Sequence, residues 1–229
     1  MLHLDEVGST NDWLRTNAAQ FGDGQWVTAR RQTAGRGRMG RGWQAPEGNL
    51  AASCLIRPRP GEGAPAELGF VAALALHDVA SALAPDAPLQ LKWPNDLLLG
   101  GAKLSGILLE REGETVVLGV GVNLAHAPEV PGRRTAALAD AGVAIDPETF
   151  AERLAAAFEA RRRQWGTQGF AAISADWLAC AHPIGTRLAL SGGGPQGRFA
   201  GLGPDGALLL DGEDGVRHVV RAGDVWPAV

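Results

Sequence analysis

Residues 35–43 read GRGRMGRGW, so four glycines are interleaved with three arginines directly before a tryptophan. Glycine leaves the backbone free to adopt positive φ and to bring its N–H groups close to a ligand. The guanidinium groups add fixed positive charge and forked donors that match phosphate or carboxylate. This segment, which we call the glycine–arginine loop, therefore predicts a site for an anion, either a nucleotide phosphate or an acyl phosphate.

The first six residues of the loop also satisfy the dinucleotide-binding pattern G-x-G-x-x-G. That fingerprint requires a helix to begin within the loop, because the helix N-terminus receives the pyrophosphate. Here the chain continues as RGWQAPEGNL, with Pro46 and Gly48 before an apolar strand, which disfavours a Rossmann fold. The phosphate-loop pattern and the H-E-x-x-H, C-x-x-C and G-x-S-x-G motifs are absent from the sequence, so a covalent enzyme intermediate is not favoured.

Composition places the chain among ordinary globular proteins. It has 229 residues, 45% hydrophobic and 20% charged, with a formal net charge of −4. The negative net charge argues against a protein whose main role is to bind nucleic acid. Cys54 and Cys180 each lie in an apolar run, which indicates buried free thiols. The acidic N-terminus does not resemble a signal peptide, and apolar runs fall short of the roughly 18 residues that span a membrane. We therefore expect a cytoplasmic enzyme.

Working outward from the loop, apolar runs predict a strand on each side of it, at 25–31 and 49–56. The proline-free, alanine-rich stretch 66–84 predicts a largely buried helix. Short turns between the apolar runs that follow predict an antiparallel or mixed sheet with helices on one face. The remaining segments are expected to be strands at 2–7, 89–93, 96–99, 103–111 and 115–124, and helices at 9–18, 146–165 and 168–180.

The pattern changes after residue 182. Short apolar runs then alternate with glycine-rich turns about ten residues apart, which is typical of a small all-β domain. We expect an α+β protein with a larger domain over residues 1–182 and a small β domain over residues 183–229.

Two further stretches carry groups suited to phosphate chemistry. Residues 92–107 read KWPNDLLLGGAKLSGI, and Asn95 and Asp96 are oxygen ligands of the kind that Mg²⁺ accepts beside substrate phosphates. Lys103 lies on an apolar hairpin strand, where a solvated surface lysine and a functional lysine are about equally expected. The stretch GVGVNL ends in Asn123, a weak signal alone because many buried strands look like this.

Together these three stretches resemble the catalytic domain of biotin protein ligases. The family pattern GRGRxGR-x-W matches Gly35 to Trp43, and KWPND with a lysine eleven positions after its first residue matches Lys92 to Asp96 and Lys103. Ser9, Thr10 and Asn11, then Gln32, and GVGVN at residues 119–123 fall in family order. The resemblance implies a class II synthetase-like catalytic domain with a mixed, largely antiparallel sheet flanked by helices. It also implies an SH3-like barrel at the C-terminus.

The resemblance implies an ATP-dependent ligase that forms biotinyl-5′-AMP and passes the biotinyl group to one lysine of a carrier protein. It assigns catalytic roles to Lys103, Arg38 and Asp96, the last orienting the target amine or a metal-bound water. Biotin contacts are implied for Ser9, Thr10, Asn11, Gln32, Arg36, Gly37, Arg38 and Lys103. Nucleotide contacts are implied for Arg36, Arg38, Arg41, Trp43, Lys92, Asn95, Lys103 and Asn123. Mg²⁺ is expected with ATP, with Asp96 and Asn123 as its candidate ligands.

The implied partner is the biotin carboxyl carrier domain of acetyl-CoA carboxylase or a related carboxylase. Ser9 lies close to the start of the chain, which predicts a ligase without the DNA-binding domain of some relatives. A lipoate-attaching enzyme shares the adenylation logic and is the nearest alternative. An RNA-binding module built on the arginine-rich loop is a distant one. The sequence does not choose between a monomer and a homodimer. The glycines of the loop predict a lid that orders over the adenylate.

Overall fold

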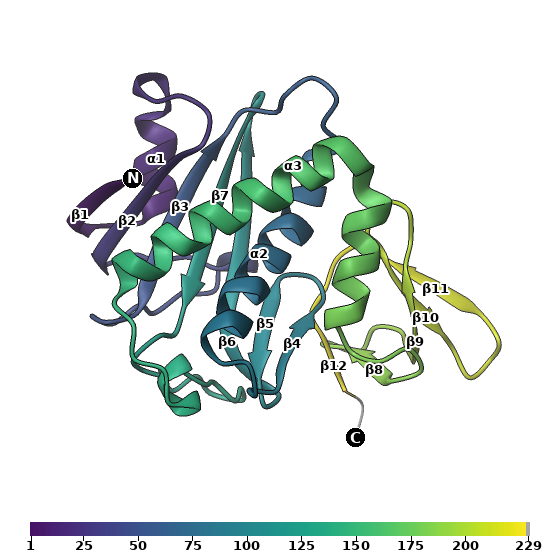
Figure 1. The fold of residues 1–229 in the computed structure, drawn as a ribbon. Helices are drawn as coiled ribbons and strands as arrows, with labels where there is room; N and C mark the ends of the chain where they lie inside the picture. The colour runs from purple at the N-terminus through teal and green to yellow at the C-terminus, as the bar shows by residue number, and fades with distance from the viewer. Residues whose placement is uncertain (228–229) are drawn as a thin grey trace.

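The computed structural model describes residues 1–227 and contains two β-sheets (Figure 1). The larger sheet has seven strands in the order β1-β2-β3-β7-β6-β5-β4. Strand β1 runs parallel to β2, with Leu2 opposite Val27, and every other pair of neighbours is antiparallel. The predicted mixed, largely antiparallel sheet is confirmed. Its strands are β1 (Leu2–Val7), β2 (Gln25–Gln32), β3 (Leu50–Ile56), β4 (Leu89–Lys92), β5 (Asp96–Leu99), β6 (Ala102–Glu112) and β7 (Thr115–Val122).

Helices cover both faces of this sheet, so the expectation of helices on one face is wrong. Helices α2 (Leu68–Leu83) and α3 (Pro147–Cys180) pack on one face, where Cys54 and Ile56 join their core. Helix α1 (Thr10–Thr16) packs on the other face, where Leu14 contacts a core that contains Leu55. Side chains alternate between faces along a strand, and β3 is buried at all seven positions. A strand without polar alternation gives no sequence signal for which face a neighbouring helix covers.

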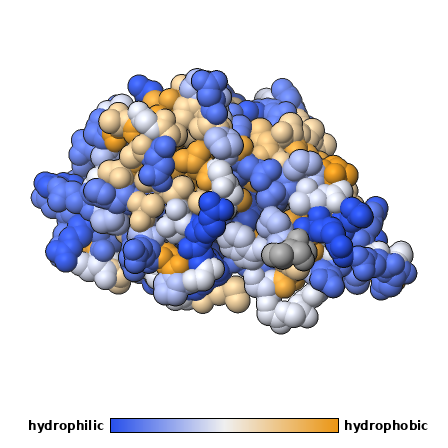
Figure 2. All heavy atoms as spheres, turned by 90° about the horizontal axis from the view of Figure 1, so that it is seen from below, coloured by the Kyte–Doolittle hydropathy of each residue, from blue (hydrophilic) through white to orange (hydrophobic). Residues whose placement is uncertain are grey.

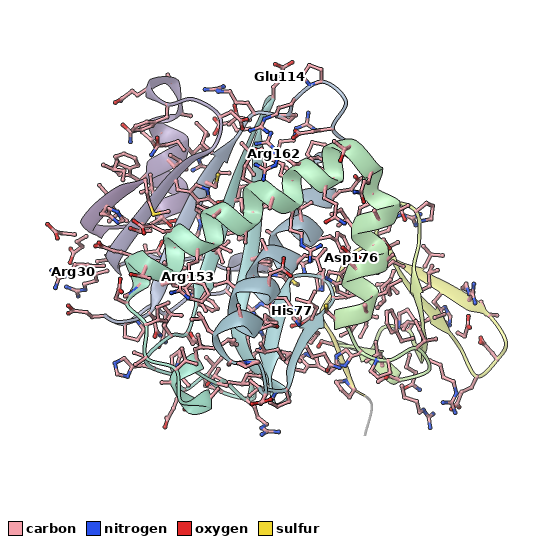
Figure 3. All side chains as sticks on the ribbon, in the orientation of Figure 1. Arg30, His77, Glu114, Arg153, Arg162 and Asp176 are labelled. Atoms are coloured by element: carbon pink, nitrogen blue, oxygen red, sulfur yellow. The ribbon has the colours of Figure 1, made fainter. Side chains whose placement is uncertain are left out.

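Helix α3 is two helices joined at a sharp bend, as the sequence predicts (Figure 1). At the bend Gly169 has φ 75° and ψ 177°, a conformation open essentially to glycine alone. An ion pair crosses the bend: Arg161 lies 2.6 Å from Asp176 on the second half and 2.7 Å from Asp78 of α2. Figure 3 shows Asp176 on the second half of the bent helix and Arg162 on the first.

A buried arginine of α3 holds the chain segments at one end of strands β2 and β3. Arg162 has a fully buried side chain, 2.6 Å from Glu62 and 2.8 Å from Asp23, and it donates to the Arg57 carbonyl at 2.9 Å. Two carboxylates and a carbonyl therefore satisfy the guanidinium, which a buried charge requires. The contacts join α3 to the segments that precede β2 and follow β3.

Residues Pro65–Leu83 form the one helical segment of the described chain that is long and apolar enough to cross a membrane by length and composition alone. The segment comprises a 3₁₀ turn (Pro65–Glu67) followed by α2. In the fold α2 contacts both the sheet and α3, and it contributes eleven buried residues. Core packing therefore accounts for its hydrophobicity.

The smaller sheet follows α3 and has the order β11-β10-β9-β8-β12, with all neighbours antiparallel. Four of its strands are predicted from sequence, and β12 is not, because three residues near a terminus carry little pattern. Trp93 ties the sheets together by donating to the Gly206 carbonyl at 3.0 Å. The domain division at residue 182 stays a prediction. The strands are β8 (Arg187–Leu190), β9 (Gln196–Leu202), β10 (Leu208–Asp211), β11 (Arg217–Val220) and β12 (Val225–Pro227).

The surface at the lower end of the molecule mixes polar and mildly apolar residues, with strongly apolar residues in small, separate patches (Figure 2). Patches of that size are ordinary for the surface of a folded protein.

Candidate active site

A cavity of about 440 Å³ lies on the face of the larger sheet that carries α1. Strands β3, β6 and β7 form its floor, and the glycine–arginine loop and the segment 124–136 form its walls. Gly106, Gly119 and Gly121 lie on this floor, and because glycine has no side chain the cavity is deeper there. A Cβ at Gly119 would lie 2.5 Å from Oδ1 of Asn11, and one at Gly121 would overlap the Trp43 indole. The glycines therefore make room for functional side chains.

One end of the cavity carries neutral polar groups from the start of α1. Ser9 is the N-cap of the helix, with its hydroxyl 3.5 Å from the Asp12 amide. Gln32 reaches this helix from the end of β2, and its Oε1 accepts from the Thr10 amide at 2.8 Å and from the Thr10 hydroxyl at 3.0 Å. Asn11 lies one residue further on and is also buried. All four predicted biotin-binding polar residues thus line one cavity.

Two residues absent from the sequence-based site hold Asn11 in place. The fully buried Ser53 hydroxyl lies 2.6 Å from Asn11 Oδ1, and Asn11 Nδ2 donates to Glu110 at 2.7 Å. An amide with both ends bonded has a fixed orientation. Ser53 had a detectable signal, since it is a polar residue inside the apolar run AASCLI. Glu110 had none, because it lies 99 residues from Asn11.

The glycine–arginine loop folds over the cavity and closes on itself. Trp43 N donates to the Gly35 carbonyl at 2.9 Å, and Gly37 N donates to the Arg41 carbonyl at 2.7 Å. At the tip Met39 has φ 59°, an uncommon backbone conformation for a residue with a side chain. The two ends of this hairpin-like loop therefore meet each other, and its tip is strained.

The arginines of the loop point to different partners. Arg36 lies 2.6 Å from Asp12 and 3.2 Å from Glu110, and the hydrogen bond that Arg36 donates to Asp12 raises the pKa of Arg36 above its ordinary value. Arg38 donates to Asn95 Oδ1 at 3.2 Å, and within the described residues no carboxylate lies within 4.0 Å of its guanidinium. Burial lowers the pKa of Arg38, but a guanidinium stays protonated. Arg38 therefore brings an unneutralised positive charge to the cavity.

The opposite end of the cavity is charged. Lys103 Nζ lies 2.6 Å from Asp96 Oδ1, and its side chain is 15% exposed. Lys92 lies 3.2 Å from the other Asp96 oxygen and 2.7 Å from Asp224 of the smaller sheet. The Lys92 side chain is fully buried beneath Trp226, 4.1 Å from the ring centroid, and does not line the cavity. The structure thus places Lys103 on the wall and Lys92 behind it, joining the two sheets.

Trp43 and Asn123 each present a polar atom with no partner. The Trp43 indole lies on the glycine floor, 5.7 Å from Lys103 Nζ to the ring centroid, and its Nε1 is buried without a hydrogen bond. Asn123 donates to the Ala136 carbonyl at 3.0 Å, while its buried Oδ1 has no partner. Both residues line the cavity, and a buried polar atom without a partner is uncommon in a folded protein.

A metal site made by the protein alone is not favoured. Residues 1–227 contain no group of three or more His, Cys, Asp or Glu side chains placed to hold a metal ion. Both oxygens of Asp96 face ammonium groups, so this carboxylate fits a lysine-positioning role better than a metal-binding role. Among residues 1–227, Asn123 Oδ1 is a buried side-chain oxygen without a hydrogen-bond partner, on a residue that lines the cavity.

Comparison with known proteins agrees with this arrangement. Residues 4–124 match the Biotin/lipoate A/B protein ligase family. The chain is 43% identical to a biotin–[acetyl-CoA-carboxylase] ligase of Paracoccus denitrificans, covering 97% of this chain and 98% of that protein. It is 40% identical to the corresponding ligase of Mycobacterium tuberculosis, covering 96% and 86%. A biotin protein ligase from Aquifex aeolicus, solved with biotin and ATP, superposes with a TM-score of 0.87 at 26% identity, covering 99% of this chain and 98% of that one.

The chain therefore belongs to the Biotin/lipoate A/B protein ligase family. The fold that the sequence resemblance implies is confirmed, including a small β-sheet at the C-terminus. Within the family, the relatives described above are ligases that act with biotin.

Proposed function

We propose that this chain is an ATP-dependent biotin ligase, which activates biotin as biotinyl-5′-AMP and transfers the biotinyl group to a lysine of a carrier protein. The observation that carries the proposal is the division of the cavity, which has hydroxyl and amide groups at one end, where Arg36 is paired with Asp12 and Glu110, and Lys103 and Arg38 at the other. That division matches a substrate with a neutral ring system at one end and a carboxylate at the other. The names of the relatives favour biotin over lipoate.

At the neutral end, the ureido group of biotin needs both donors and acceptors without net charge. Ser9, Thr10, Asn11 and Gln32 supply hydroxyl and amide groups there. Trp43, lying on the glycine floor, supplies an apolar surface for the ring or for the acyl tail. The loop residues Arg36 and Gly37 then lie over the bound molecule.

At the charged end, two anions must approach each other. The biotin carboxylate attacks the α-phosphorus of ATP, a P–O bond forms, and pyrophosphate leaves. Lys103 and Arg38 offset the repulsion and stabilise the developing charge, and each charge-assisted hydrogen bond contributes roughly 1.5–3 kcal/mol. Asp96 positions Lys103 from 2.6 Å away. In the second step the neutral amine of the carrier lysine attacks the acyl carbonyl, AMP leaves, and the amine gives up a proton.

Mg²⁺ would enter with ATP, and when bound it supplies neutralising charge to the phosphates. Asn123 is the residue that would hold it, because its amide oxygen is buried without a partner. Asn95 and Arg41 line the same cavity.

The partner would be the biotin carboxyl carrier domain of acetyl-CoA carboxylase or of a related carboxylase, as the names of the relatives imply. We further propose that the protein acts in the cytoplasm without binding DNA or membrane. Its net charge of −4 supports the absence of nucleic-acid binding.

The test combines the protein with biotin, MgATP and a biotin carboxyl carrier domain, and measures the mass of the carrier. We expect ATP-dependent addition of one biotinyl group to one lysine, and no addition when lipoate replaces biotin. A folded protein that labels the carrier only with lipoate, or with neither acid, contradicts the proposal.

A further inference from the structure

The segment 124–136, which follows β7, carries a cation that neither the sequence motifs nor the proposed mechanism uses. Its residues Pro128, Val130, Pro131 and Arg133 line the cavity beside the glycine–arginine loop. Arg133 is partly buried, with its side chain 23% exposed. The question is which ligand group this guanidinium faces.

The backbone fixes Arg133 relative to Lys103. Lys103 N donates to the Arg134 carbonyl at 2.9 Å, and Ala136 N donates to the Lys103 carbonyl at 2.9 Å. These two bonds form a parallel bridge between Lys103 and Thr135. Because the bridge sets the register of the two segments, Arg133 is held close to the residue that we place at the α-phosphate.

The side chain of Arg133 converges with another cation on a single carboxylate. Asp224 Oδ2 lies 2.8 Å from Arg133 and 3.1 Å from Arg41, while Asp224 Oδ1 lies 2.7 Å from Lys92. One negative charge thus faces three positive charges, and Trp226 lies close to two of them, 6.0 Å from Arg133 and 4.1 Å from Lys92. A carboxylate that holds two guanidiniums in this way orients both of them toward one position.

The positive charge at this end exceeds the negative charge. Asp96 and Asp224 are the carboxylates of the ion-paired cluster, and Glu129 also lines the cavity. The cations outnumber these carboxylates by five to three and are Arg38, Arg41, Lys92, Lys103 and Arg133, of which all but Lys92 line the cavity. A surplus of cations at one end of a partly closed cavity favours a ligand group with several negative charges. The carboxylate of biotin and the α-phosphate use Lys103 and Arg38, which leaves the guanidiniums of Arg41 and Arg133 on the cavity wall for the β- and γ-phosphates.

We propose that Arg133 binds the pyrophosphate portion of ATP, both before the α–β bond breaks and as the leaving group, with Arg41 as its neighbour. This assignment rests on the proposed function, since it places the triphosphate at the charged end of that cavity. Asp224 holds the two guanidiniums together. The adjacent Arg134 is exposed and forms no ion pair within residues 1–227, so it provides a matched control.

The experiment compares Arg133→Ala and Arg133→Lys with Arg134→Ala in the full chain. The readouts are KM for ATP, inhibition by AMP, binding of biotin by calorimetry, and direct binding of inorganic pyrophosphate by calorimetry. For Arg133→Ala we expect KM for ATP and the dissociation constant of pyrophosphate to rise about tenfold or more, because one charge-assisted hydrogen bond is lost. Biotin binding and AMP inhibition should stay within twofold, and Arg133→Lys should recover part of the loss. Arg134→Ala should match the wild type throughout.

Unchanged pyrophosphate binding in a folded Arg133→Ala variant overturns the assignment, and so does an equal loss of AMP inhibition, which would place Arg133 at the nucleoside end. An equal loss of pyrophosphate binding in Arg134→Ala would show that the effect comes from net charge alone. This outcome would also overturn the assignment of Arg133. The proposed function is tested separately. It is wrong if the wild-type protein does not biotinylate the carrier. Pyrophosphate binding by the variants still decides the role of Arg133 in that case, because it needs no turnover.

Discussion

At the residue scale, Lys103 carries the largest share of the proposed chemistry. Its ammonium group lies 2.6 Å from Asp96 and 5.7 Å from the centroid of Trp43, at the junction of the neutral and charged ends of the cavity. The side chain is mostly buried, so its interaction with an approaching phosphate is screened little by water. A mobile surface lysine would lack both the partner and the burial.

Lys103→Ala should lose adenylate formation while keeping the fold. Removing one preorganised group that stabilises transition-state charge typically lowers kcat by about 10²–10³-fold. The measurement is biotin-dependent exchange of labelled pyrophosphate into ATP, with circular dichroism and thermal unfolding as controls for the fold. Normal pyrophosphate exchange by the folded variant would refute the role of Lys103.

The glycine floor gives a second prediction at this scale. Gly119→Ala places a Cβ 2.5 Å from Oδ1 of Asn11, so the Asn11 amide must move away from Ser53 and Glu110. KM for biotin should rise at least tenfold, and KM for ATP should change by less than twofold. Gly22→Ala, which meets no atom within 4 Å, is the matched control and should leave both constants unchanged. Equal effects on both substrates would show that Asn11 does not belong to the biotin end.

At the scale of elements, the bend in α3 depends on one residue. Gly169 has φ 75° and ψ 177°, whereas a residue with a Cβ avoids this region at a cost of about 1–3 kcal/mol. Gly169→Ala should therefore lower the free energy of unfolding by about that amount. Gly166→Ala, three residues earlier, should raise it by up to about 1 kcal/mol, because alanine is the better helix former. Chemical denaturation measures both, and a neutral Gly169→Ala would mean that the bend tolerates other conformations.

Sequence patterns predicted the helices and strands better than they predicted which face of the sheet a helix covers. The helix stripe of 146–165 and the apolar strands around the loop were read correctly, because periodicity reports what one element buries. The position of α1 on the opposite face was missed. The short apolar stripe of α1 could pack on either face of the sheet, because a central strand such as β3 is apolar on both faces.

At the scale of the whole molecule, the chain has only two lysines, Lys92 and Lys103. The Lys92 side chain is fully buried and the Lys103 side chain is 15% exposed, and both are ion-paired. A reactive biotinyl-adenylate released from the site would therefore meet no free lysine on the enzyme that made it. All other basic side chains in the chain apart from histidine are arginines, which are not acylated under these conditions because they stay protonated.

This predicts how Arg38→Gly should behave. Loss of the guanidinium over the adenylate should let the intermediate escape, so that an added unrelated protein becomes biotinylated on several lysines. The enzyme itself should remain unmodified on its side chains. Adding Arg30→Lys, at a side chain that is 64% exposed and lies far from the smaller sheet (Figure 3), should create one new labelled position on the enzyme.

Peptide mass spectrometry reads out both parts of that prediction. Strict modification of the carrier lysine by Arg38→Gly, at wild-type selectivity, would contradict the role of Arg38 in retaining the adenylate. Biotin on Lys92 or Lys103 of the folded enzyme would contradict their protection by ion pairs and burial.

The sequence by itself determined the class of chemistry, because the residues that carry it lie in short motifs whose backbone is continuous. GRGRMGRGW and KWPND place glycines, arginines and lysines at fixed spacing, and that spacing predicted a polyanionic ligand and a family. The same holds for Ser9 to Asn11, where the helix cap and the binding groups follow from three consecutive residues.

Only the tertiary structure decided which of these groups face the cavity. Lys92 belongs to a motif but turns away from the cavity to Asp224, 132 residues later, while Arg133 lies in no motif and faces it. Ser53 and Glu110 meet Asn11 across 42 and 99 residues. Such contacts follow from the order of strands in the sheets and from the seating of the smaller sheet on the larger unit. Periodicity along one segment does not encode that order, because it depends on how distant segments pack together.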